Sequence, residues 1–274
     1  MNVVWGVLVT LGVTAVAVGV MLLVRRRAPE GSYFSDGDRA SGVFGVLATG
    51  FSVLLGFIVF LAFTSYDRSR TGAEREALIL FQQIENAQFF PEDAATDLTG
   101  ELVCYGRSVV YDEWEQMEAG TFADDVNPWG IELFRTLQSV DPQGATEESA
   151  YDKWLEQTSA REEARLDRIH GAEGVIPAPL WIVLLFIAGV VFVYMLFFAD
   201  SAERAVTQGL LMGAVTSVIV MLLLLLSFLD SPFQTGVGGV RPVAMERTLR
   251  IVDDALPRAG IEVSTPCDEE GAAP

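Results

Sequence analysis

Residues 41–64 read SGVFGVLATGFSVLLGFIVFLAFT, and the apolar run 42–64 within them contains no charged residue. At about 1.5 Å of rise per residue, a helix of this length crosses a hydrocarbon core of roughly 30 Å. The sequence then continues without proline to Phe90, as SYDRSRTGAEREALILFQQIENAQFF. We therefore predict a transmembrane helix that leaves the bilayer and carries on as a stalk into a polar domain.

Small or weakly polar residues recur along one side of this predicted helix. They are Gly45, Thr49, Ser52 and Gly56, at steps of 4, 3 and 4, which keep them on one helical face. If symmetric copies of the helix enclosed an ion path, this face would line it. Bulky Phe57 or Phe60 would then form a dewetting constriction.

Hydropathy places three further spans in the chain. Of its 274 residues 51% are hydrophobic, although the formal net charge is −19. The runs long enough to span a bilayer are 3–24, 42–64, 179–198 and 205–229, and none contains Asp, Glu, Lys, Arg or His. This absence argues against a proton relay or an ion-coupled transporter. We predict an all-α membrane protein: four transmembrane helices with an extramembrane α-helical bundle inserted between the second and third spans.

Arginines in the short loops predict the topology. Loop 25–41 holds four arginines and loop 200–204 holds one, so the positive-inside rule places both loops in the cytoplasm. The chain is then a multi-pass plasma-membrane protein with extracytoplasmic N- and C-termini. Its predicted parts are the first two transmembrane helices with their short basic inner loop (1–64), an acidic extracytoplasmic helical domain continuing the second helix (65–176), the third and fourth transmembrane helices (177–229), and an extracytoplasmic C-terminal helix and tail (230–274).

The negative charge is concentrated in the two predicted extracytoplasmic segments. Residues 65–176 hold 24 acidic against 9 basic side chains, and the tail from Asp230 holds 8 against 4. Such a surface attracts cations and repels nucleic acid and anionic lipid. We therefore expect ions and no nucleic acid as partners of this surface, and the lipid bilayer as the partner of the four spans. The alternative is a solvated surface that carboxylates keep soluble.

Helical periodicity recurs within the extramembrane segments. Apolar residues near a spacing of 3.6 predict a helix over 97–120. The pair Asn127-Pro128 predicts the start of a helix over 129–140, and Gly171 is a natural C-cap for a long polar helix over 146–170. One more amphipathic helix is predicted over 242–256. The apolar faces of the first three would pack with the stalk into a bundle.

Two cysteines fall on the same predicted side of the membrane. Cys104 lies in the long loop and Cys267 in the tail. On an oxidising face they would form a disulfide that ties the tail to the domain; the alternative is two unpaired thiols.

The fourth span carries a second ladder of small residues. Ala205, Gly209, Gly213 and Ser217 recur at every fourth position, a GxxxG-type ridge that lets helices approach closely. We predict a helix-packing ridge, within one subunit or between subunits, with pore lining as the alternative.

Site chemistry of the kind that enzymes use is absent from the sequence. We find no nucleophile–base pair, no metal-ligand cluster and no phosphate loop. The one histidine, His170, falls at the end of a predicted helix, where a cationic side chain suits the carbonyl end. We therefore predict no catalytic residue, no metal site, no cofactor and no enzymatic activity.

Several phrases of the chain resemble an actinobacterial family of membrane proteins that is described as bestrophin-like and has no known function. They are SDGDRASGVFGVLATGFSVLLGFIVFLAFTSYDRSRTGAE (35–74), LVCYGRSVV (102–110), NPWG (127–130), RIHGAEGVIPAPLW (168–181) and GVGGVRPVAMERTLR (236–250). Bestrophins are pentameric anion channels with four spans per subunit and a constriction lined by the second helix. The resemblance thus implies a homo-oligomer, a pentamer by analogy, with its pore along the helix of residues 42–64.

Two functional hypotheses remain open at this point. The first is an oligomeric ion channel or pore, whose acidic outer vestibule would favour cations over anions. The second is a non-conducting, membrane-anchored scaffold that presents its extracytoplasmic helical domain to a partner, with the spans as an anchor.

Overall fold

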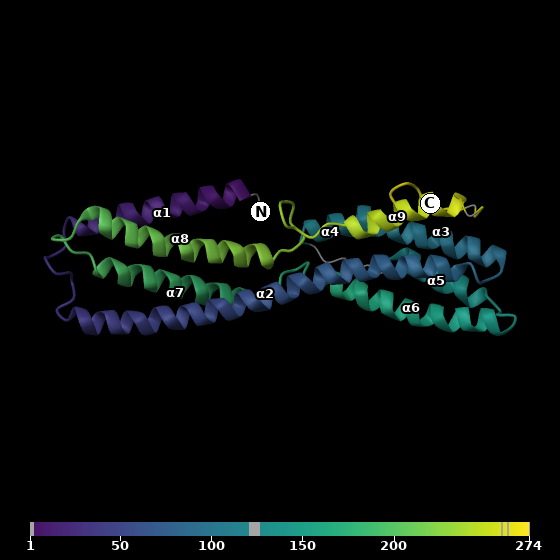
Figure 1. The fold of residues 1–274 in the computed structure, drawn as a ribbon, viewed down its shortest axis with the longest axis horizontal. Helices are drawn as coiled ribbons and strands as arrows, with labels where there is room; N and C mark the ends of the chain where they lie inside the picture. Colours follow the sequence, from purple (N-terminus) through teal and green to yellow (C-terminus); the bar gives the residue numbers. More distant parts are fainter. Residues whose placement is uncertain (1–2, 121–126, 259, 262, 274) are drawn as a thin grey trace. The chain divides into compact units, whose positions relative to one another are not determined.

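The computed structural model describes residues 3–120, 127–258, 260–261 and 263–273, and within these ranges the regular structure is helical, without a strand (Figure 1). The elements are α1 (Val3–Arg25), α2 (Gly37–Ala87), α3 (Glu92–Ser108), the π-helical turn η1 (Val109–Glu113), α4 (Trp114–Glu118), α5 (Pro128–Ser139), α6 (Ala145–Ile169), α7 (Ala178–Phe197), α8 (Ala205–Leu229) and α9 (Val243–Arg258). The predicted fold class, four membrane-spanning helices with an inserted helical bundle, is confirmed.

The chain divides into two compact units. The first, here called the membrane unit, comprises Met1–Thr64, Val175–Asp230 and Thr235–Val237. The second, here called the bundle unit, comprises Ser65–Gly174, Ser231–Gln234 and Gly238–Pro274. Helix α2 contributes its first part to the membrane unit and its remainder to the bundle unit.

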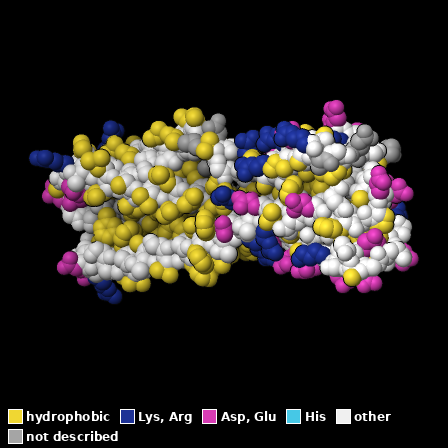
Figure 2. All heavy atoms as spheres, turned by 45° about the vertical axis from the view of Figure 1, so that its right-hand side comes forward, with side chains coloured by type: hydrophobic (Ala, Val, Ile, Leu, Met, Phe, Trp, Pro, Cys, Tyr) yellow, Lys and Arg dark blue, Asp and Glu magenta, His cyan; other side chains and the backbone are white. Residues whose placement is uncertain are grey.

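Within the membrane unit, α1, α2, α7 and α8 are each long and apolar enough to cross a bilayer. Figure 2 shows hydrophobic side chains over this unit, as expected of helices that face hydrocarbon. The two short loops lie together, because the amide of Tyr33 donates to the carbonyl of Phe197 at 3.2 Å and Arg25 donates to the carbonyl of Ser201 at 3.0 Å. Both loops are therefore at the same end of the unit.

Asp230 joins the other ends of α7 and α8. Its Oδ1 accepts from the amides of Val175 and Ile176 at 2.8 and 2.9 Å, and its Oδ2 accepts from Nε1 of Trp181 at 3.3 Å. One carboxylate thus accepts from backbone amides that precede α7 and holds this segment at the C-terminal end of α8.

The bundle unit encloses one hydrophobic core. The part of α2 that belongs to this unit buries Ala77, Leu80 and Ile84 in it. Leu98, Leu102 and Tyr105 of α3 and Trp154 of α6 are fully or almost fully buried in the same core. The apolar periodicity of residues 97–120 and 146–170 is explained by this packing.

One predicted helix was wrong in its extent and regularity. The helix expected over 97–120 begins earlier, at Glu92 directly after Pro91, and contains the π-helical turn η1 before it ends with α4. Proline suits this start because the first amides of a helix need no intrahelical acceptor. The residue that a π-turn inserts changes the helical phase, and Glu113, Trp114 and Met117 are consequently all buried.

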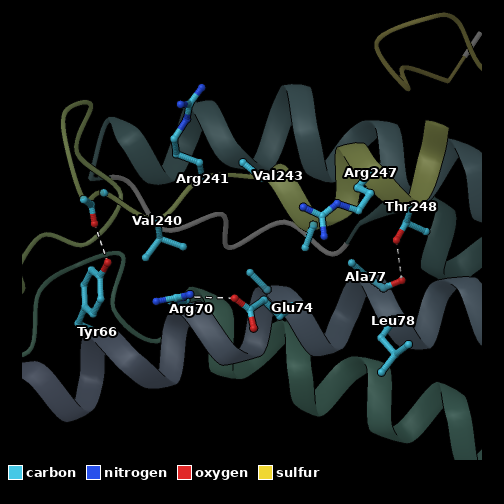
Figure 3. Close-up of a pocket in the computed structure, with 14 residues that line it drawn as sticks. Tyr66, Arg70, Glu74, Ala77, Leu78, Val240, Arg241, Val243, Arg247 and Thr248 are labelled. Atoms are coloured by element: carbon cyan, nitrogen blue, oxygen red, sulfur yellow. Dashed lines mark hydrogen bonds and ion pairs between the residues drawn. The ribbon is translucent and has the colours of Figure 1, made fainter. Parts of the chain in front are cut away.

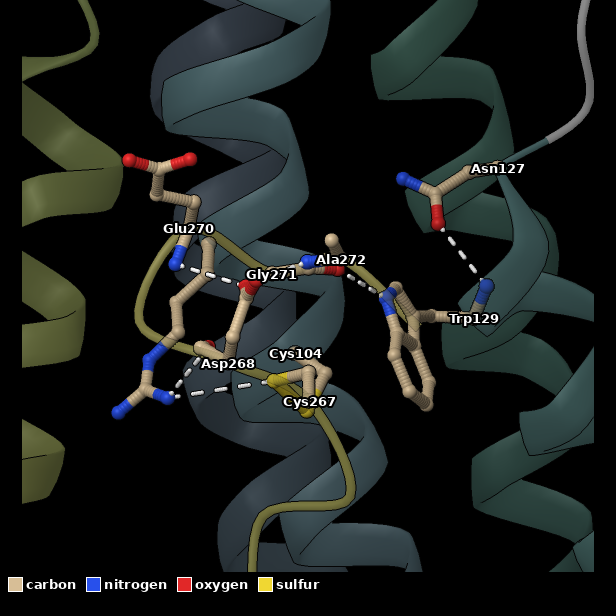
Figure 4. Close-up of a disulfide and its surroundings, with 9 residues drawn as sticks. Cys104, Asn127, Trp129, Cys267, Asp268, Glu270, Gly271 and Ala272 are labelled. Atoms are coloured by element: carbon tan, nitrogen blue, oxygen red, sulfur yellow. Dashed lines mark hydrogen bonds between the residues drawn. A yellow bond between two sulfur atoms is a disulfide. The ribbon is translucent and has the colours of Figure 1, made fainter. Parts of the chain in front are cut away.

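The disulfide expected between Cys104 and Cys267 is present, with 5.8 Å between the two Cα atoms (Figure 4). It fastens the segment after α9 to α3. Two further bonds hold that segment: Nε1 of Trp129 donates to the carbonyl of Gly271 at 2.7 Å, and Arg107 donates to the carbonyl of Asp268 at 3.0 Å. The C-terminal tail is therefore part of the bundle unit.

Candidate functional site: the exposed face of helix α2

The small face of α2 is exposed in the single subunit. Gly45, Thr49, Ser52 and Gly56 are all exposed in the membrane unit, and Ser52 and Gly56 also border a groove against α7 and α8. A second face, about 120° around the helix, is buried among the helices of the unit, with Phe51, Leu55 and Ile58 only 5%, 2% and 3% exposed. The buried face thus anchors α2 in the unit, and the small face stays free.

The glycines on this face have open space around them. A Cβ atom built on Gly45 or Gly56 would meet no atom within 4 Å. Close packing inside the subunit therefore does not explain their small size. What they do provide is a smooth surface to which an ion, water or a second helix can come close.

The hydroxyl group of Ser52 donates its proton to the carbonyl of Ala48 at 2.8 Å. Such a bond back into the helix satisfies the donor and leaves the oxygen lone pairs exposed. Ser52 therefore presents an acceptor to whatever lies on this face, which suits a cation or the hydrogen of a water molecule.

Bulky aromatic residues follow the small residues along α2. Phe57 and Phe60 are 61% and 63% exposed. Phe60 is four residues beyond Gly56 and shares its face, whereas Phe57 points about 100° away from Gly56 because it is the next residue in the helix. Phe63, 52% exposed and about two turns beyond Gly56, also lies on this face, although the sequence reasoning did not single it out.

A groove of about 460 Å³ flanks the small face inside the membrane unit. Helices α2, α7 and α8 form it, and Ser52 supplies the one polar side chain of its lining. Apart from Ser52 and Gly56, which belong to the small face, the lining is apolar, so the rest of the groove suits hydrocarbon or apolar side chains.

The ladder of small residues on α8 has a different environment. Helix α8 packs along α1, and a Cβ on Gly213 would come within 3.4 Å of Val18 and 3.5 Å of Thr14. The hydroxyls of Thr14 and Ser217 are 2.9 Å apart, a hydrogen bond between the two helices. A Cβ atom on Gly209 would likewise lie 3.4 Å from Val18, whereas Ala205 in the first turn of α8 is partly exposed.

In the bundle unit, α2 again leaves one face exposed, and this face is acidic. Asp67, Glu74 and Glu85 are exposed there, at spacings that correspond to whole helical turns. Glu74 accepts from Arg70 at 3.2 Å in a pair that is open to solvent. The other glutamate of this stretch, Glu76, is completely buried.

Glu76 belongs to a buried ionic network that the sequence reasoning missed. The guanidinium group of Arg168 donates to both oxygens of Glu76 and also to Glu113. The hydroxyl of Tyr105 donates to Glu76 at 2.7 Å, and Arg165 lies 3.2 Å from Glu113. The network joins α2, α3, η1 and α6. The one signal for it in the sequence is that Glu76 lies on the same side of α2 as the apolar residues that the bundle unit buries.

Mutual pairing keeps this network charged. Burial by itself would raise the pKa of Glu113, but Arg168 and Arg165 outweigh it and lower the pKa to about 2. Burial would lower the pKa of Arg168, yet the two glutamates raise it above its ordinary value. Burial, and then the charge of Glu76, raise the pKa of the Tyr105 phenol, so that this group remains a proton donor. We assign the network to holding α2 in the bundle unit.

The described residues contain no group of His, Cys, Asp and Glu that could hold a metal ion. His170 is exposed at the end of α6. The exposed face of α2 therefore remains the candidate functional site.

A family model described as "Bestrophin-like domain" matches residues 11–245. The match covers most of the chain, which therefore belongs to the bestrophin-like family. No curated protein sequence matches the chain.

Solved structures show the same fold. Crystal structures of two single-substitution variants of a bacterial bestrophin homologue from Klebsiella pneumoniae are similar, with TM-scores of 0.67 and 0.64 at 12% and 13% identity. Each comparison covers 92% of this chain and 98% of the other. A crystal structure described as a membrane protein matches over 100% of both chains, with a TM-score of 0.61 and 12% identity. At such identities the similarity establishes the fold alone.

Proposed function

We propose that this protein is an oligomeric ion channel or pore in the plasma membrane, with the small face of α2 lining the conduction path. The observation that carries the proposal is the exposure of Gly45, Thr49, Ser52 and Gly56 on a helix that buries another of its faces in the subunit. Membership of the bestrophin-like family supports the same function.

A single subunit presents this face but cannot enclose a path. A ring of copies around an axis parallel to α2 would bring the small faces together, with Phe60 and Phe63 as the narrow, apolar part. The number of subunits we propose by analogy with the bestrophins is five.

The charge of the bundle unit supports a preference for cations. We place the bundle unit and both termini outside the cytoplasm, because arginines concentrate in the two short loops of the membrane unit. The exposed carboxylates Asp67 and Glu85 would then raise the local cation concentration at the outer mouth. The acceptor oxygen of Ser52 suits the same ions.

Purified full-length protein in planar bilayers under a KCl gradient tests the proposal. We expect a conductance whose reversal potential is shifted toward the equilibrium potential of K⁺. The conductance of Ser52→Phe should be at least tenfold lower, because the new ring would fill the path. Ile182→Phe serves as the matched control, since Ile182 is 68% exposed on α7 and not on the small face of α2. It should conduct like the wild type.

Absence of conductance above protein-free bilayers, from protein shown to be oligomeric, would overturn the proposal. That result would favour the scaffold hypothesis, in which the spans anchor a bundle unit that binds a partner. Conductance that is equal in wild type and Ser52→Phe would instead place the path elsewhere in the assembly.

A further inference from the structure

A groove of about 730 Å³ lies within the bundle unit, between α2 and the chain segment that leads into α9 (Figure 3). Arg241 and Arg247 lie on the α9 side, and the Arg70–Glu74 pair lies on the α2 side. Exposed apolar side chains, Leu78 and Val243, complete its surface. The groove is therefore basic and partly apolar, in a protein with a net charge of −19.

The arginines of α9 differ from most others in the bundle unit. Arg68, Arg135, Arg165 and Arg168, for example, each make an ion pair with a carboxylate at 3.2 Å or closer. Within the described part of the chain, Arg247 and Arg250 make no ion pair. They lie on one exposed stripe of α9, which consists of Val243, Arg247, Arg250 and Asp254 at steps of 4, 3 and 4.

Helix α6 carries a second exposed stripe with the complementary character. Its members are Glu148, Asp152, Leu155, Ser159, Glu162 and Leu166, at alternating steps of 4 and 3, and all are exposed. This alternation is the spacing by which two helices pack along a shared seam. Leu155 and Leu166 are 43% and 60% exposed, which is unusual for leucines in a helical seam that stays in water.

The two stripes lie at matching levels along α2. Thr248 donates to the carbonyl of Ala77 at 3.3 Å. On α6, the backbone of Arg168 lies against Gly72 and the hydroxyl of Thr158 accepts from Gln83, so Glu162, which lies between them, is near the height of Leu78. Arg247 and Glu162, the neighbours of Thr248 and Arg161, are therefore within about a helical turn of each other in height.

The directions of the two helices also match. Later residues of α6 contact earlier residues of α2, so α6 is antiparallel to α2. Later residues of the segment 238–248 contact later residues of α2, so this segment and α9 run parallel to α2. Helices α6 and α9 are therefore antiparallel. In an antiparallel pair with Leu166 opposite Val243, Glu162 falls opposite Arg247, since both stripes step by four residues there. Figure 1 shows α6 and α9 on opposite sides of α2 within the bundle unit, so the stripes of one subunit cannot meet.

We propose that the groove between α2 and α9 receives the exposed stripe of α6 from a second copy of this chain, with Glu162 of one copy paired to Arg247 of the next. Because the two surfaces differ, the contact is heterologous, and repeated around the axis of the proposed function it would form a closed ring. The inference rests on the proposed function, which supplies a symmetry axis parallel to α2. Rotation about that axis keeps each residue at the same height, so residues of similar height in neighbouring copies can meet.

Cysteine cross-linking in full-length protein tests the contact. The native cysteines are bonded to each other, so Glu162→Cys and Arg247→Cys would provide the free thiols. The double variant should give a ladder of covalent oligomers in a non-reducing gel, reaching the full ring. Each single variant, and the matched pair of Glu163→Cys with Arg247→Cys, should give little cross-linking, because Glu163 points about 100° away from Glu162.

A charge swap gives a second, independent readout. Arg247→Glu and Glu162→Arg should each raise the dissociation constant of the oligomer about tenfold or more, and the double swap should restore association. Arg135→Glu, which removes an exposed arginine of α5, is the control and should leave the oligomer unchanged.

The outcomes separate this inference from the proposed function. An intact, conducting oligomer that gives no ladder would overturn the α6–α9 contact and leave the channel standing. A ladder without conductance would support the contact and contradict the channel. A monomer that inorganic phosphate stabilises, with the effect lost in Arg247→Glu, would assign the groove to an anionic ligand and overturn the inference.

Discussion

Helices α2 and α8 each carry small residues about four positions apart, and the two ladders lie in opposite surroundings. On α8, Gly209 and Gly213 contact Val18 of α1 in the same subunit. On α2, Gly45 and Gly56 have open space where a side chain would be. Small residues at helical spacing therefore allow another group to come close to the helix. They do not determine whether that group is a helix of the same subunit, as on α8, or something outside the subunit, as on α2.

The bundle unit repeats this contrast with charged residues. Glu74 and Glu76 are two positions apart on α2, yet one is exposed and the other is completely buried. The exposed carboxylate is open to solvent, whereas the buried one holds the helix in the bundle. Each of the following predictions compares one member of such a pair with the other.

The largest effect is expected from Glu76→Ala. This variant leaves Arg168 buried without one of its two carboxylates, which should lower the free energy of unfolding by about 3 to 5 kcal/mol. Glu74→Ala, the control, should cost below about 1 kcal/mol because its pair with Arg70 is exposed. Denaturant unfolding of the full-length protein, followed by tryptophan fluorescence, measures both, and equal losses would refute the assignment of the buried network.

Acid should weaken the same network through Glu113. Its pKa is about 2 in the folded protein against an ordinary value of 4.5, so its contribution is fully present above about pH 4.5 and is lost as the pH falls toward 2. Over that interval the free energy of unfolding should fall by about 3 kcal/mol on account of this group. Glu113→Gln should remove this part of the pH dependence; a profile as steep as that of the wild type would contradict the role of Glu113.

An intermediate effect is expected from enlarging the glycines. Gly213→Leu would force a side chain against Val18 and Thr14 and should cost about 1 to 3 kcal/mol in detergent micelles. Gly45→Leu introduces the same side chain into open space and should leave the stability of the single subunit almost unchanged. Thermal denaturation of the detergent-solubilised chain distinguishes the two, and the reverse order would show that α2 packs in a way that the structure does not contain.

The smallest effect concerns the hydroxyl groups on α1. Thr14→Val removes the partner of Ser217 and should cost about 0.6 kcal/mol, the usual value for a hydrogen bond between membrane helices. Thr10→Val loses a hydrogen bond at 2.9 Å to the carbonyl of Gly6, which lies in the same helix. It should therefore leave α1–α8 association, measured by cross-linking, unaffected, while Thr14→Val weakens it.

Much of the fold could be predicted from the sequence because its determinants are local. Hydropathy identified all four spans, apolar periodicity identified the helices of the bundle, and a shared side of the membrane paired Cys104 with Cys267. The π-helical turn η1 escaped prediction because its phase shift is stabilised by distant contacts, chiefly those of Glu113 with Arg168.

The candidate site was predictable in its position and not in its environment. Helical spacing grouped Gly45, Thr49, Ser52 and Gly56 on one face, but which face of α2 is buried depends on where α7 and α8 pack. The same limit applied to Glu76, whose partner Arg168 lies far away in the sequence and meets it only in the folded bundle.

The central claim is that water and ions reach the small face of α2 in the assembled protein. Its most direct test is the reaction of Ser52→Cys with a cationic, water-soluble methanethiosulfonate reagent during bilayer recording; the native disulfide leaves no other free thiol. We expect progressive block in Ser52→Cys and no change in Ile182→Cys on α7. A Ser52→Cys channel that conducts like the wild type and never responds to the reagent would contradict the account.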